Sequence, residues 1–145
     1  MGRRVSGYVL AVLAMLAASP AVANSLVEVT VLGVRDDQGV VRVALCTAAE
    51  FLSAHCTYNA TVPAHRGTVL VQLADIPPGA YAAQAWHDEN NNGRLDRDFL
   101  GIPRRGVGFS NDPALLLGPP AFAKTAFAVG PDVSRASLRL RYFKF

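Results

Sequence analysis

One short stretch of acidic and amide residues has the spacing of a metal-binding loop. "WHDENNNGRLDRD", residues 86–98, holds six Asp or Asn residues between Asp88 and Asp98, with a glycine among them. Calcium takes about six to eight oxygen ligands, and carboxylate and amide groups supply them. The D-x-N-x-N-G spacing that starts at Asp88 matches the first half of an EF-hand calcium loop. We therefore expect a calcium site in this loop.

The predicted ligands alternate along the loop, so a tight turn can bring them together. With Asp88 at position one, Gly93 falls at the sharp turn of the calcium loop. Phe99 occupies the position of the bidentate Glu, and a strand rather than a helix precedes the loop, so the site is not an EF-hand. Asn111 or Asp112 are candidates to complete it. The predicted ligands are Asp88, Asn90, Asn92, the backbone carbonyl of Arg94, Asp96 and Asp98.

A turn that binds no ion is the competing interpretation of the same residues. Asp and Asn side chains often cap backbone amides in turns. Arg94 and Arg97 also offer positive charge to the crowded carboxylates. If calcium binds, two neutral Asn ligands predict a dissociation constant on the order of 10⁻⁴ to 10⁻³ M and a structural role for the ion.

Catalysis would have to start from His87, next to Asp88, with Ser110 in "GFSND" as a nucleophile. The chain has no G-x-S-x-G nucleophile pattern and no set of histidines spaced as zinc ligands. We therefore expect a non-catalytic binding or accessory module of the cell envelope, with a protein or carbohydrate ligand. A hydrolase or carbohydrate-active protein that uses the 87–112 loop is the alternative.

Aromatic residues around the loop allow two interpretations. Trp86, Phe99, Phe109 and Phe122 lie in or near it. They could offer a sugar- or peptide-binding surface, because aromatic rings give a large contact area. We favour the alternative that they form a small second core beneath the loop.

The first 23 residues are typical of a secretory signal peptide. Arg3 and Arg4 precede an uncharged apolar run, and "SPAVANS" suits cleavage before Asn24. The run is shorter than the ~20 residues of a spanning helix, so we expect export to the periplasm or outside, without membrane insertion. Cleavage leaves 12 of the 14 basic residues against 11 acidic ones. They are scattered along the chain, which argues against nucleic-acid binding.

The two cysteines, Cys46 and Cys56, lie in the part expected to be exported, which favours a disulfide. A metal site that adds His55 has no recognisable ligand spacing. "TAAEFLSA", residues 47–54, begins with the capping-box pattern of Thr47 and Glu50. A straight helix would hold the cysteines about 15 Å apart, whereas a disulfide needs less than ~7 Å. We therefore expect only a turn or two of helix.

Alternating apolar and polar residues predict strands over much of the remaining chain. The alternation is regular in residues 26–34, 67–75 and 137–143, and weaker in 40–46, 80–88 and 124–129. Short strands between Gly, Pro and Asx turns are typical of an antiparallel β-sandwich. We expect one all-β domain over residues 24–145, immunoglobulin-like or transthyretin-like, with a long irregular loop from Asp88 to about Pro120.

The string "HDENNNGRLDRDFLGIPRRGVGFSND", followed by "GPPAFAKTAFAV", resembles a family of small exported bacterial proteins, the domain of unknown function numbered twenty-one forty-one. The resemblance covers nearly all of residues 24–145. It implies a secreted β-sandwich and no established activity. The family pattern has an acidic residue before Gly106, where this chain has Arg105, so a ligand role is not carried over to that position.

Overall fold

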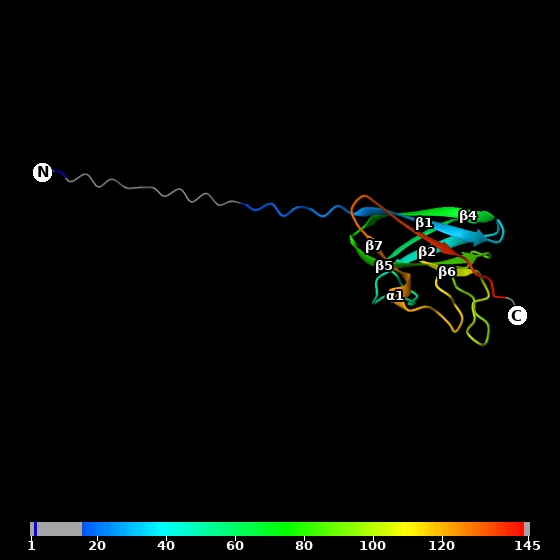
Figure 1. Ribbon diagram of the computed structural model, residues 1–145. Helices are drawn as coiled ribbons and strands as arrows, with labels where there is room; N and C mark the ends of the chain where they lie inside the picture. Colours follow the sequence, from blue (N-terminus) through cyan, green and yellow to red (C-terminus); the bar gives the residue numbers. More distant parts are fainter. Residues whose placement is uncertain (1, 3–15, 144–145) are drawn as a thin grey trace.

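The chain folds into two stacked β-sheets (Figure 1). The computed structural model describes residue 2 and residues 16–143, so most of the expected signal peptide lies outside the described residues. One sheet has the strand order β4-β1-β8 and the other the order β3-β2-β5-β6, with β7 also paired to β5. The predicted β-sandwich is confirmed.

The three-stranded sheet supplies one half of the core. β1 (Ser25–Val34) runs antiparallel to β4 (Gly67–Ile76) and parallel to β8 (Val133–Arg139). The predicted alternation is confirmed on β1 and β4, because every second side chain points into the space between the sheets. These inward side chains include Val27, Val29, Val31, Val69, Val71 and Leu73.

The five-stranded sheet carries the candidate site at its central strand. β2 (Val40–Cys46) lies between β3 (Tyr58–Pro63) and β5 (Gly79–Asp88). On the other side of β5, β7 (Ala126–Val129) pairs with the first half of the strand and β6 (Val107–Phe109) with the second half. β5 therefore has neighbours on both sides up to the point where the long loop begins.

Several element boundaries differ from the prediction. The expected loop from Asp88 to Pro120 is wrong as a single segment, because β6 divides it into two loops. β3 was not predicted either. β7 is shorter than expected because Phe122–Thr125 form the single-turn helix α1. β8 starts at Val133 because its polar first half forms a continuous parallel ladder with β1.

The segment between the cysteines resolves the conflict between helix and disulfide. Cys46 and Cys56 form a disulfide with a Cα–Cα distance of 4.9 Å, which confirms the predicted pairing. The backbone N–H groups of Glu50 and Phe51 donate to the carbonyl of Thr47 at 3.1 and 3.0 Å, so the chain makes turns instead of an α-helix. Within the described residues, no helix has the length and apolar character needed to cross a membrane.

Candidate functional site

Asp88, the last residue of β5, is fully buried and holds the start of the long loop. Its Oδ2 accepts hydrogen bonds from Arg42 Nε at 2.7 Å and from the N–H of Gly93 at 2.8 Å. Its Oδ1 accepts from the N–H of Asn92 at 3.1 Å and, when the Asn90 amide is rotated so that its nitrogen faces the acceptors, from that nitrogen at 2.9 Å. Burial raises the pKa of the Asp88 carboxyl, but the hydrogen bonds and the charge of Arg42 outweigh burial and hold that pKa below its ordinary 3.8.

Arg105 forms a second set of contacts with side chains of the same loop. Its Nη1 donates to Glu89 Oε2 at 2.8 Å, and its Nη2 donates to Asp96 Oδ2 at 3.2 Å. In the rotated orientation of its amide, the Asn90 side-chain oxygen also accepts from Arg105 Nη2 at 3.1 Å. A guanidinium group thus lies among oxygens that the sequence assigned to a metal ion.

The remaining predicted ligands bond to their own turns. Asn92 Oδ1 accepts from the N–H of Arg94 at 2.9 Å. Asp98 Oδ1 accepts from the N–H groups of Leu100 and Ile102, both at 2.9 Å. These contacts are Asx turns, in which a side chain caps backbone donors two to four residues ahead.

The oxygens predicted to bind calcium have the right chemistry, but the side chains that carry them already accept N–H hydrogen bonds. Asn111 and Asp112, the candidates to complete the site, also have other partners: Asn111 donates to the carbonyl of Ala126 at 3.0 Å, and Asp112 pairs with Arg141 at 3.0 Å. The calcium site therefore stays a prediction. The contacts favour the alternative, a turn closed by arginines and backbone amides.

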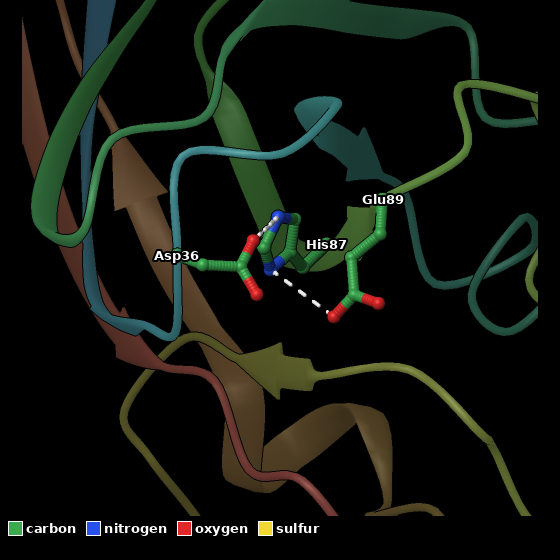
Figure 2. Close-up of side chains that lie close together, drawn as sticks. All are labelled: Asp36, His87 and Glu89. Atoms are coloured by element: carbon green, nitrogen blue, oxygen red, sulfur yellow. Dashed lines mark ion pairs between the residues drawn. The ribbon is translucent and has the colours of Figure 1, made fainter.

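A different cluster surrounds His87, whose side chain is fully buried. His87 Nε2 lies 2.7 Å from the carbonyl of Gln38, which can only accept, so this nitrogen carries the proton. Nδ1 lies 2.9 Å from the hydroxyl of Tyr142. Figure 2 shows a carboxylate on each side of the ring: Asp36 is 3.7 Å from Nε2 and Glu89 is 3.8 Å from Nδ1. Both ring nitrogens are therefore hydrogen-bonded.

Arg35 supplies the positive charge of this cluster. Its guanidinium pairs with Glu89, has its Nε 3.5 Å from Asp36, and lies 4.7 Å above the ring centre of Tyr142. Among the described residues, Asp36, His87 and Glu89 are the group of three whose metal-ligand atoms lie within 4.8 Å of one another. Arg35 already pairs with both carboxylates of this group, so a metal ion would compete with it. No sequence motif marks this cluster, because Asp36 and His87 are far apart in the chain and meet only through the β2–β5 pairing.

Ser110, the candidate nucleophile, is fully buried and holds two elements together. Its hydroxyl accepts from the N–H of Ala83 at 2.9 Å and donates to the carbonyl of Thr125 at 2.5 Å. The hydroxyl therefore joins the end of β6 to β5 and α1, and neither of its partners is His87.

The sequence model of one bacterial family, described as "Uncharacterized protein conserved in bacteria (DUF2141)", matches residues 29–136. The chain belongs to this family. No curated protein and no solved structure matches it. The resemblance seen in the loop motif is confirmed, and the description of the DUF2141 family assigns no activity to it.

Arg105 has a structural explanation in this DUF2141 chain. Here the guanidinium bonds to Glu89 and Asp96, so the chain supplies its own cation to the acidic loop.

Part of the predicted second core forms in this DUF2141 protein. Phe51, which the sequence analysis did not single out, packs edge-on against Phe109 and Phe122, with ring centres 6.0 and 5.7 Å apart. Trp86 lies on the same side of the sheet, and its enclosed Nε1 has no hydrogen-bond partner. Phe99 is different, because 92 % of its surface is exposed.

Proposed function

We propose that this DUF2141 protein is a non-catalytic binding module of the cell envelope that binds its partner through the loop between β5 and β6. One observation carries the proposal. The acidic side chains of the loop are occupied in holding its shape, whereas Phe99 and Leu100 at its end project into solvent, 92 % and 67 % exposed. Two adjacent large apolar side chains on a loop held by hydrogen bonds offer an apolar surface to a partner.

The alternative, a hydrolase or carbohydrate-active protein, has less support. His87 and Ser110 are the residues that it would use, and both are inaccessible to solvent. Each also has hydrogen-bond partners within the fold, so it is not free to exchange a proton with a substrate.

The cell-envelope setting is part of the proposal. The expected signal peptide leads to the periplasm or the exterior, and the Cys46–Cys56 disulfide suits such an oxidising compartment. A calcium ion that orders the loop is a further proposal, compatible with the same non-catalytic role.

A photo-reactive phenylalanine analogue placed at Phe99 in cells tests the binding surface. The matched control carries the analogue at Leu70, an exposed leucine (53 %) on β4 in the other sheet. We expect covalent adducts at position 99 that are absent at position 70. No adduct at position 99, or the same adducts at both positions, would contradict the proposed surface.

An activity screen tests the non-catalytic role separately. Purified residues 24–145 are offered generic ester, peptide and glycoside substrates, beside the variants His87→Ala and Ser110→Ala. We expect no turnover by any of the three proteins. A turnover that disappears in a variant still folded by circular dichroism would support the hydrolase alternative.

A further inference from the structure

The end of the β5–β6 loop is a small closed turn, residues 97–103, called here the 97–103 tip. Arg97 and Pro103 form an isolated antiparallel bridge at its base. The N–H of Asp98 donates to the carbonyl of Ile102 at 2.9 Å, and the N–H of Gly101 donates to the carbonyl of Asp98 at 3.0 Å. The Asp98 carboxylate accepts hydrogen bonds from the N–H groups of Leu100 and Ile102. Most backbone donors of the tip are thus satisfied inside the tip itself.

The internal hydrogen bonds of the tip lower the cost of moving it into an apolar environment. Backbone polar groups without partners are costly to move into an apolar environment. Because the tip bonds its own amides, Phe99 and Leu100 can leave water with little loss of backbone hydrogen bonds. Phenylalanine and leucine are also side chains that interfacial membrane segments bury.

Arginines without an acidic partner flank the apolar pair. The carboxylates of Asp88 and Asp96 pair with Arg42 and Arg105. Among the described residues, no ion pair is formed by Arg94, Arg97 or Arg104. Arg97, Arg104 and Arg105 line a shallow hollow with Asp96. The loop thus combines an apolar end with unpaired positive charge just behind it.

A second apolar pair lies on the next loop. Leu116 and Leu117, between β6 and α1, are 88 % and 103 % exposed. In Figure 1 both loops extend from the five-stranded sheet on the side away from β1 and β4.

We propose that the 97–103 tip docks on the surface of a bilayer that contains anionic lipids, which deepens the proposed binding function and depends on it. Phe99 and Leu100 enter the boundary between headgroups and acyl chains, and Arg94, Arg97 and Arg104 bind lipid phosphates. The attachment is peripheral, because the tip is far too short to span a bilayer. The partner is chosen by charge complementarity: unpaired arginines beside an apolar end match a negative headgroup layer above hydrocarbon.

Co-sedimentation with vesicles tests this proposal. The protein used is residues 24–145, which contain every described strand and helix, and whose described hydrogen bonds lie between Ser25 and Tyr142. We expect binding to vesicles of phosphatidylglycerol mixed with phosphatidylcholine, and much weaker binding to phosphatidylcholine alone. Added salt should weaken the binding, because it screens surface charges.

Variants of the tip define the surface. The double change Phe99→Ser and Leu100→Ser should lower the partition coefficient about tenfold or more. Arg94→Gln and Arg104→Gln should each lower it about fivefold, on anionic vesicles only. Leu70→Ser and Arg139→Gln, matched changes on the other sheet, should leave it unchanged.

Two results would overturn the lipid assignment. One is the absence of binding to anionic vesicles by folded protein, and the other is binding that the tip variants do not reduce. If the vesicles fail while position 99 still crosslinks to a protein or glycan in cells, the proposed binding function survives and only the lipid partner is wrong. If position 99 crosslinks to nothing, the binding function itself fails.

Discussion

The Asp88 side chain orders the start of the β5–β6 loop, which is the role predicted for a calcium ion. Its two oxygens collect N–H groups from Asn92 and Gly93, and Arg42 neutralises its charge. A buried carboxylate is stable only when it is paired and hydrogen-bonded. The shape of the loop therefore depends on this buried side chain more than on the half-buried acids that follow it.

Replacement of Asp88 by Asn should destabilise the protein strongly. The change leaves the Arg42 guanidinium, 25 % exposed, without its counter-charge. We expect a loss of about 2–4 kcal/mol in the free energy of unfolding, measured by urea denaturation. The matched control is Asp96→Asn, because Asp96 is 34 % exposed and pairs with Arg105. That change should cost less than about 1 kcal/mol, and equal losses in the two variants would contradict the anchoring role of Asp88.

The lowered pKa of Asp88 predicts how this difference depends on pH. A carboxyl whose pKa is depressed on folding stabilises the protein above its ordinary pKa, and that contribution is lost as the pH falls through the folded-state pKa. The gap in stability between the native protein and Asp88→Asn should therefore be largest near about pH 6 and shrink below about pH 4. Asp36 and Glu50, whose pKa values are also lowered, are present in both proteins, so their effects cancel. A constant gap across this range would exclude Asp88 as the titrating group.

Among the elements, the sequence predicted the longer strands whose alternation builds the core and missed the short strands β3 and β6. β1 and β4 alternate because one face of each is buried between the sheets. β3 also alternates, but it is short and none of its side chains is fully buried: Tyr58, Ala60 and Val62 are half-buried against the core. β6 has only three residues, one of them a glycine, and forms because β5 offers an unpaired edge there. The loop motif did not predict that Asp98 bonds within its own turn, nor that Arg42 from β2 and Arg105 from the end of the loop pair with the other acids.

At Gly108, β6 of one sheet lies very close to the end of β8 in the other. A Cβ at this position would lie 2.5 Å from the backbone oxygen of Arg139 and 2.9 Å from Leu138 Cδ1. Gly108→Ala must therefore push β6 away from β8, and we expect a loss of about 1–3 kcal/mol in unfolding free energy. At Gly130 an added Cβ has no atom within 4 Å, so Gly130→Ala is the control and should change stability by less than about 0.5 kcal/mol. Similar losses at the two glycines would mean that the effect is not one of packing against β8.

In the molecule as a whole, the residues that stabilise the fold and the exposed apolar residues of the loops lie in different places. The core between the sheets and the disulfide, worth about 3 kcal/mol on a loop-entropy argument, hold the sandwich. The long loops lie outside this core. Polar contacts hold their shape, and exposed apolar side chains lie at their ends. Changes at the 97–103 tip should therefore alter binding without lowering the melting temperature.

Calcium can be tested on the whole molecule by thermal unfolding of residues 24–145, first in EDTA and then in about 5 mM calcium. For a dissociation constant of about 10⁻³ M, this concentration adds about 1 kcal/mol to the free energy of unfolding and raises the melting temperature by a few degrees. Arg105 already pairs with Asp96, so a bound ion would compete with it for that carboxylate. If calcium binds, Arg105→Gln should therefore enlarge the shift, Asp88→Ala should abolish it, and magnesium should produce less of it. Equal melting temperatures in EDTA and calcium, for both the native protein and Arg105→Gln, would leave the loop as a turn closed by arginines and backbone amides alone.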